Sequence, residues 1–323
     1  MKKIIFITLI ALVSAISVKA QQDPAYSMYM FNGLFLNPAY AGSQEAISLM
    51  AIYRHQWVGI EGAPRTANIS VHGPFRRDQY AMGMAISNDM FGHTNVFSVT
   101  PSFAYRLRIK KSRLCFGVQT SLAYYYQDNK ATALADDVTD NPFRINQSLF
   151  VPNFGFGIYA YGERYFIGAS VPHLLPSRLR DGTGVIVNNE AIAKVYNYYL
   201  FTAGYVFGKD ASIVKFRPSV LMKYQQGLPK NIPQFDIDLA LLLFERVWIG
   251  GGYRSGGDQT SVGQSAIAFI QFKITPQLQI GYSYDAEISS LRHFTSGTHE
   301  IMIGYDFWYD KKRFVTPRYV KYF

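Results

Sequence analysis

Residues 232–243 read IPQFDIDLALLL, and this stretch decides the fold class. Apolar side chains from Phe235 to Leu243 alternate with the acids Asp236 and Asp238, so the two kinds would point to opposite faces of an extended strand. A strand with lipid on one side and a polar lumen on the other requires this pattern. The same period of two recurs in 213–225, 277–286 and 298–308.

The alternation predicts about fourteen strands along the chain. Their predicted spans are 46–58, 66–74, 80–88, 95–108, 112–126, 151–161, 164–172, 196–207, 212–225, 232–244, 246–255, 262–273, 277–286 and 298–308. Short connections alternate with longer ones, of which 127–150 and 173–195 are the longest. Tight periplasmic turns and larger external loops are typical of outer-membrane barrels. We therefore expect an all-β fold, a transmembrane antiparallel β-barrel with both termini in the periplasm.

The composition supports a membrane barrel over a soluble β-sandwich. Aromatic residues make up 16% of the chain and charged residues only 17%, whereas about a quarter of a soluble domain is charged. After the first twenty residues, no apolar run is long enough for a membrane helix. A soluble sandwich also alternates, but it has no reason to sort its connections by length.

The N-terminus carries the layout of a secretory signal. Lys2 and Lys3 precede an apolar run from Ile4 to Val13. The stretch that follows ends in Val18-Lys19-Ala20, with compact residues at the two positions that a signal peptidase reads. The run is too short for the alternative, an anchor helix. We expect a cleavable signal peptide over 1–20, a periplasmic or lumen segment over 21–45, the barrel over 46–308 and a periplasmic tail over 309–323. Residues 21–45 would either plug the lumen or line its periplasmic mouth.

Nothing in the sequence predicts catalysis, a bound cofactor or a metal centre. The net charge is +10, but the cations are scattered between strands, which argues against nucleic-acid binding. The single cysteine, Cys115, excludes internal disulfides and cysteine clusters. Residues 155–160 match a dinucleotide-binding fingerprint only in form, because strand alternation continues through them. The six histidines show no metal spacing, and no serine–histidine pair for an outer-membrane hydrolase stands out.

Two acidic groups have both a binding and a structural interpretation. Loop 127–150 holds Asp136, Asp137, Asp140 and Asn141, which would either bind calcium or remain a solvated polar loop. Asp236 and Asp238 would share the lumen face. An ion path or acid–base pair is possible there, but we expect ion pairs with Arg217 and Lys223 on the preceding strand.

The connection between the first two strands is rich in residues of protein contact sites. It contains Arg54, Gln56, Trp57 and Arg65 around a Gly-Ala-Pro turn. Tryptophan and arginine are favoured at protein interfaces and also in the interfacial belts of membrane proteins. These four residues are thus candidates for partner binding. Equally, they would fold the loop into the lumen or against the N-terminal segment.

Several blocks of the sequence resemble a known family. They are Asp23-Pro24, Met30-Phe31-Asn32, Leu36-Asn37-Pro38-Ala39-Tyr40-Ala41-Gly42-Ser43, Tyr53-Arg54, Gln56-Trp57-Val58-Gly59, Gly62-Ala63-Pro64-Arg65-Thr66, Ser170-Val171-Pro172-His173-Leu174-Leu175 and Thr316-Pro317-Arg318-Tyr319. Together they resemble the PorP/SprF family, and the likeness runs from the mature N-terminus almost to the end. The tail departs from it by extending to Val320-Lys321-Tyr322-Phe323.

The resemblance implies an outer-membrane component of the type IX secretion system of Bacteroidota. Such a protein would be no enzyme. It would support secretion or anchoring of large surface proteins with C-terminal sorting domains, including gliding adhesins, and would contact periplasmic components of the same machine. The alternative function is a diffusion channel or a transporter of hydrophobic solutes. An open polar lumen would favour that alternative, and a lumen filled by 21–45 would exclude it.

Overall fold

A computed structural model describes residues 25–75, 79–128, 147–175, 177–179, 193–195, 197–225, 232–256 and 263–307. The wall strands are β1 (Ile47–His55), β2 (Arg65–Phe75), β3 (Tyr80–Phe91), β4 (Thr94–Ile109), β5 (Ser112–Gln127), β6 (Gln147–Tyr161), β7 (Tyr165–Val171), β10 (Tyr198–Tyr205), β11 (Val214–Gln225), β12 (Gln234–Leu243), β13 (Val247–Arg254), β14 (Ser265–Lys273), β15 (Leu278–Glu287) and β16 (Thr298–Phe307). Short 3₁₀ turns are η1 (Tyr29–Phe31), η2 (Gly33–Phe35), η3 (Pro38–Tyr40) and η6 (Ser290–His293). No helix in these described ranges is long and apolar enough to cross a bilayer.

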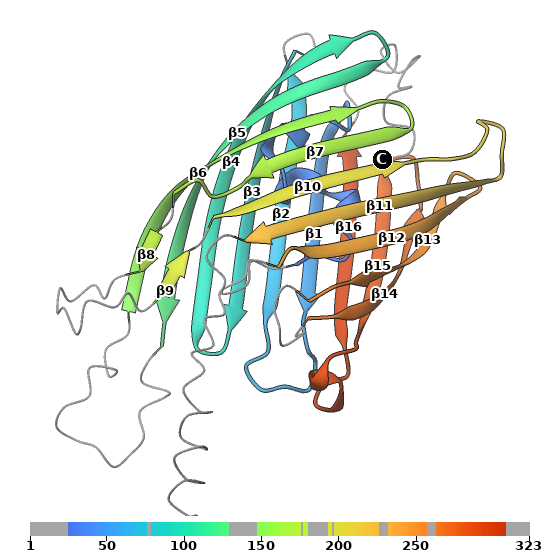
Figure 1. The fold of residues 1–323 in the computed structure, drawn as a ribbon. Coiled ribbons are helices and arrows are strands. Elements are labelled where there is room, and N and C mark those ends of the chain that lie inside the picture. The colour runs from blue at the N-terminus through green and yellow to red at the C-terminus, as the bar shows by residue number, and fades with distance from the viewer. Residues whose placement is uncertain are drawn as a thin grey trace, which may run out of the picture.

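The fourteen wall strands form one closed antiparallel barrel (Figure 1). Each strand pairs with its sequence neighbours, and β1 closes the wall by pairing with β16 from Ile47 opposite Phe307 to His55 opposite His299. Closure leaves no strand at an open end of the sheet, which suits a bilayer because it offers no water to the backbone. The predicted antiparallel barrel of about fourteen strands is therefore confirmed, with strand boundaries within four residues of those expected.

Two connections differ from the sequence prediction. The link between β3 and β4 was expected to be a longer loop, but β3 continues to Phe91 and only Gly92 and His93 remain between the strands. Gly92 has a φ of +55°, the left-handed conformation that a tight hairpin turn needs. In the predicted loop 173–195, β8 (Ser177–Leu179) and β9 (Ala193–Val195) pair as a small separate hairpin. Strands this short are below the length at which alternation is visible.

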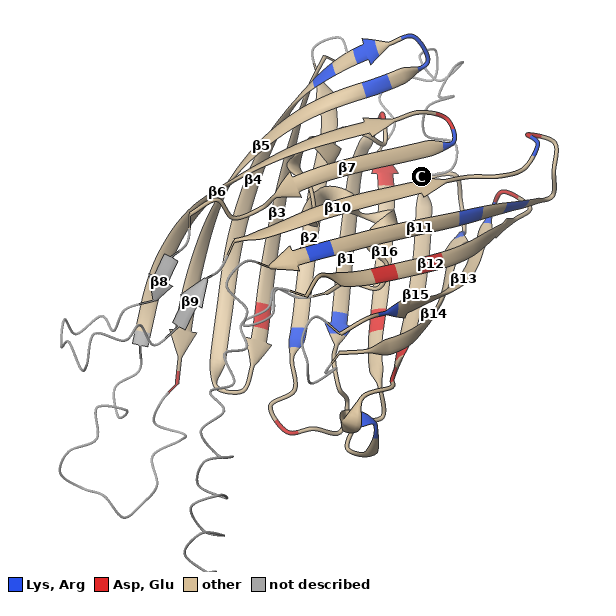
Figure 2. Cartoon of the chain, in the orientation of Figure 1, with Lys and Arg blue, Asp and Glu red and all other residues tan. Residues whose placement is uncertain are grey.

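The barrel has two different ends. We call the end with the β1–β2 and β15–β16 connections the long-loop end, and the end with the tight turns after β4, β6, β12 and β14 the short-turn end. Charged residues lie mainly toward the strand ends and connections (Figure 2). Aromatic side chains form outward-facing clusters near the short-turn end, in which Phe75, Tyr80 and Phe103 are in ring contact. Such clusters are typical of the aromatic girdle at a membrane interface.

The outer and inner faces of the wall have opposite chemistry. On β12, Ile237 and Leu239 are half exposed on the outside, while Asp236 and Asp238 are fully buried inside. The buried apolar clusters lie in the lumen, between the wall and residues of the N-terminal segment such as Met28 and Leu34. The lumen thus holds the packed core, and the exposed apolar outer face is what lipid would cover.

An outward charge tests where lipid covers the wall. Leu239→Arg places a guanidinium halfway along β12, and we expect it to lower the free energy of unfolding by about 2–4 kcal/mol. Phe235→Arg, at the long-loop end of the same strand, should cost about 0–1 kcal/mol because it reaches the interface. Equilibrium denaturation of the refolded barrel in lipid vesicles measures both. Equal effects of the two variants would contradict the proposed depth.

Candidate functional site: a filled lumen and a cavity at the long-loop end

A cluster of buried ions holds the first described residues inside the lumen. Arg54 of β1 lies 2.7 Å from Asp285 of β15 and 2.9 Å from Glu300 of β16, and all three are almost fully buried. The Glu300 carboxylate accepts the backbone N–H groups of Ser27 at 3.0 Å and Met28 at 2.8 Å. The Ser27 hydroxyl donates to Asp285 at 2.6 Å. Three wall strands therefore converge on one point of the N-terminal segment.

Arg254 of β13 extends this cluster. Its guanidinium lies 2.8 Å from Asp236 and 3.3 Å from Asp285, and it donates to the backbone carbonyl of Tyr26 at 3.1 Å. The sequence predicted that Asp236 would pair with Arg217 or Lys223 on the preceding strand, but its ion pair is with Arg254 on the following strand. The arginine reaches it because Asp236 and Arg254 are directly opposite in the β12–β13 register.

Arg217 of β11 is held by aromatic rings. Its guanidinium carbon is 4.0 Å from the ring centroid of Trp248 and 5.0 Å from that of Phe31 in η1. Phe31 also makes edge contacts with Trp248 and Phe269. The expected ion pair between Arg217 and Asp238 is not formed in the described part of the chain. Cation–π contacts of this kind strengthen when they are shielded from water, so Phe31 links the segment to β11, β13 and β14.

The second half of the segment is anchored by its own polar side chains. Asn37 donates to the carbonyls of Ile158 at 2.9 Å and Ala169 at 3.3 Å, and its oxygen caps η3 by accepting from Ala39. Further along, the Gly42 N–H donates to His72, and Glu45 pairs with Arg106 of β4. The segment thus crosses the lumen to the short-turn end, where β1 begins.

Glycines in the wall make room for this half of the segment. A Cβ on Gly117 of β5 would collide with the backbone of Ala39, and one on Gly157 of β6 would collide with the Asn37 side chain. Both glycines face inward on continuous strands. For Gly157 this agrees with the sequence interpretation of residues 155–160, in which strand alternation continues through the apparent dinucleotide fingerprint. The Gly-rich stretch of β6 therefore serves close packing of the segment.

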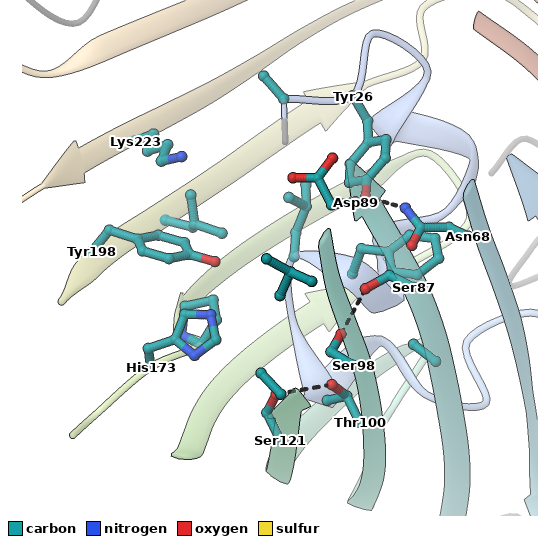
Figure 3. A pocket seen from close by; sticks show the side chains of 18 of the residues that line it. Tyr26, Asn68, Ser87, Asp89, Ser98, Thr100, Ser121, His173, Tyr198 and Lys223 are labelled. Carbon is teal, nitrogen blue, oxygen red and sulfur yellow. Dashed lines mark hydrogen bonds between the residues drawn. The ribbon is translucent and has the colours of Figure 1, made fainter. Parts of the chain in front are cut away.

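A cavity of about 190 Å³ lies over the segment on its long-loop side (Figure 3). Leu34, Phe35 and Leu36 are among its lining residues, and its walls come from the long-loop halves of β3–β5 and β10–β12. Hydroxyl groups line the wall: Ser87 and Ser98 are 2.6 Å apart, and Thr100 donates to Ser121 at 3.3 Å (Figure 3).

The opposite wall of the cavity is aromatic and basic. The Lys223 ammonium is 4.8 Å from the ring centroid of Tyr198, and His173 makes an edge contact with the same ring. The mixture of hydroxyl, aromatic and charged groups suits a polar segment of a partner. No cluster of metal-ligating side chains is present in the described part of the chain. The acidic cluster expected in loop 127–150 lies outside the described residues.

The candidate residues of the β1–β2 connection separate into different environments. Arg54 belongs to the buried ion cluster, whereas Arg65 is exposed on the outer face of β2, where its Nε lies 3.3 Å from His55. Gln56 donates its backbone N–H to Pro64 at 2.9 Å and closes the loop. Trp57 donates its indole N–H to Glu287 at 3.1 Å.

Trp57 and its neighbours join two long connections into one platform at the long-loop end, which we define as residues 56–64 and 288–297. The N–H of Val58 donates to Gly297 at 2.9 Å, and the N–H of Ser296 donates back to Val58 at 2.7 Å. The backbone N–H of Trp57 also donates to Thr298. Phe294 on this platform is 72% exposed, so an apolar side chain is presented on an ordered support.

Sequence reasoning missed most members of the ion cluster. Asp285, Glu300 and Arg254 are each the polar residue on the inward face of an alternating strand. Alternation can give such a residue an inward direction, but it contains no strand register. Their meeting with Arg54 depends on closure between β1 and β16.

Comparison with known proteins gives one family and several distant folds. The profile described as "Type IX secretion system membrane protein PorP/SprF" matches residues 18–305. A Pseudomonas aeruginosa FadL homologue has a TM-score of 0.46 at 12% identity, covering 90% of this chain and 96% of its own. The CymD monoaromatic hydrocarbon channel has a TM-score of 0.46 at 10% identity, covering 86% and 93%. Acinetobacter baumannii Omp33 has a TM-score of 0.43 at 8% identity, covering 82% and 100%. No curated protein matches the chain.

Removing one member of the ion cluster should strongly destabilise the barrel. Glu300→Ala leaves Arg54 without one of its two acids and the N–H groups of Ser27 and Met28 without an acceptor. We expect a loss of about 3–5 kcal/mol in the free energy of unfolding. The matched control is Asp210→Asn, which breaks an exposed pair with Arg164 and should cost at most about 1 kcal/mol. Similar losses in the two variants, measured by denaturation in vesicles, would show that the cluster holds nothing in place.

The course of the segment predicts which positions are reachable from outside. Ala25 lines the cavity at the long-loop side, whereas Ser43 is buried toward the short-turn end. A membrane-impermeant maleimide applied to intact cells should label Ala25→Cys and spare Ser43→Cys. The native Cys115 is buried and provides a low background. Labelling of Ser43→Cys alone would mean that the barrel has the opposite orientation or that the segment leaves the lumen.

Proposed function

Because the chain belongs to the PorP/SprF family of type IX secretion system membrane proteins, we propose that it supports the secretion or surface anchoring of large cargo proteins through protein–protein contacts. It is a multi-pass β-barrel of the outer membrane. The proposed cargo proteins carry C-terminal sorting domains, as gliding adhesins do. The proposed periplasmic partners are other components of the same secretion system.

The observation that carries this proposal is the filled lumen. Residues 25–45 cross it from the cavity to the short-turn end and are held at Ser27, Phe31, Asn37 and Glu45 by different parts of the wall. A diffusion channel or a hydrophobic-solute transporter needs a continuous path through the lumen. A path that started in the cavity would meet Leu34 to Leu36, which line the cavity on the side of the segment. A barrel whose lumen is occupied offers its two ends as working surfaces.

The two ends suit different partners. At the long-loop end, where the cavity also lies, the platform presents the exposed Phe294, and ordered loops are where binding residues concentrate. Within the platform, Gln56 and Trp57 would act by holding the loops together. At the short-turn end, exposed residues such as Lys110 and Lys111 would attract acidic surfaces of periplasmic partners.

Affinity purification from detergent-solubilised outer membranes tests the proposal. The tagged wild-type chain should recover a large surface protein with a C-terminal sorting domain, together with periplasmic secretion components. Phe294→Ser should recover at least severalfold less cargo, because a central exposed aromatic side chain contributes about 2 kcal/mol or more to an interface. Phe244→Ser removes an equally exposed phenylalanine from the short-turn end and should leave cargo recovery unchanged.

Conductance in a planar bilayer provides the opposing measurement. The wild-type barrel should show no steady open state. A barrel that is purified without any partner and conducts ions steadily would support the channel function and contradict the proposal. Comparable loss of cargo in Phe294→Ser and Phe244→Ser would show that the platform is not the cargo surface.

A further inference from the structure

The lipid-facing surface of the wall is almost free of charge. Outward positions of the fourteen strands can be read from the alternation of exposed and buried residues within the described ranges. They hold no aspartate, glutamate or lysine. The basic side chains at these positions are His55, Arg65 and His299. All three lie on adjacent strands, so their grouping calls for a physical reason.

These three residues form one row across the wall. The strand registers place His55 of β1 opposite Arg65 of β2 on one side and opposite His299 of β16 on the other. Tyr284 of β15 continues the row opposite His299. The Tyr282 hydroxyl lies 2.6 Å from the Nδ1 of His299. One guanidinium, two imidazoles and two phenols therefore share a single patch at the long-loop end.

Arg65 is available for an external anion. Its Nε contacts the imidazole of His55, and none of the described residues supplies it with a carboxylate partner. Arg54, which points inward on the neighbouring strand, has two carboxylates within 3 Å. A planar guanidinium whose two terminal nitrogens have no hydrogen-bond partner among the described residues matches two oxygens of a phosphate group.

The surroundings of the row point to a lipid. Below it, toward the middle of the wall, Tyr53, Ile69 and Ile301 are about half exposed and form an apolar surface that acyl chains would cover. A cation on the lipid face is costly at mid-membrane and nearly neutral at the interface. Beside anionic lipid headgroups it becomes favourable. The basic row thus lies where a lipid headgroup would be, and the apolar surface lies where its acyl chains would be.

We propose that His55, Arg65 and His299 bind the phosphate group of a glycolipid in the outer leaflet, with its acyl chains lying on the apolar surface beneath them. Arg65 carries the permanent charge, and the histidines and Tyr284 add hydrogen-bonding groups around the phosphate. This site lies outside the barrel and is independent of the proposed contacts with cargo.

Native mass spectrometry of the purified barrel with added lipid A tests the site. Wild-type protein should retain lipid A and should bind its dephosphorylated form at least about fivefold more weakly, as expected when one favourable charge contact of about 1 kcal/mol is lost. Arg65→Gln should lower lipid A retention by a similar factor and remove the preference for the phosphorylated form. Arg164→Gln removes a basic residue at the short-turn end and should retain wild-type binding.

Several results would overturn the proposal. Equal retention of phosphorylated and dephosphorylated lipid A by wild-type protein would show that no phosphate is recognised. Complete displacement of lipid A by excess inorganic phosphate would assign the site to a free anion. An equal loss in Arg65→Gln and Arg164→Gln, with both proteins folded as judged by heat-modifiable mobility, would show that the row makes no specific contribution.

Discussion

The buried contact between Glu300 and the backbone of Ser27 and Met28 is the point on which the lumen depends. A carboxylate in this position is costly unless its charge and its lone pairs are satisfied. Arg54 supplies the charge, and the two N–H groups of the segment supply further hydrogen bonds. Because the segment itself completes the site, withdrawing it would leave buried charges with fewer partners. The wall and its filling are therefore mutually dependent.

Such a cluster contributes more to specificity than to net stability. Burying ion pairs generally returns little free energy over a well-packed apolar alternative, whereas removing one partner is strongly unfavourable. In this barrel the partners come from β1, β13, β15 and β16 and from the segment. Their convergence fixes the segment's position across the closing pair of strands. The apolar contacts of Phe31 and Met28 then add packing that is not directional.

The sequence predicted the wall far better than the lumen. Alternation such as that of Phe235 to Leu243 is a property of a single strand. Because every wall strand has lipid on one side, the pattern is strong and can be recognised from local sequence. The ion cluster depends on register across strands far apart in the chain, which periodicity does not contain. Asp236 illustrates the limit: its inward direction was predictable, but its partner Arg254 was decided by the β12–β13 pairing. Similarly, Gly157 was recognisable as part of a continuous strand, but not as space for the Asn37 side chain.

Filling the lumen changes what a barrel can do. In an open barrel the inward polar side chains face solvent and can act on a solute. In this barrel Arg54, Arg217 and Glu300 are buried in contacts inside the lumen. The side chains that remain accessible to partners lie at the cavity, on the platform and on the outer wall. The outward positions of the described strands are nearly uncharged, so the basic row stands out on the lipid-facing wall as the surface suited to an anion. Because the N-terminal segment fills the lumen, the surfaces that can bind partners are the lipid-facing wall and the two ends of the barrel.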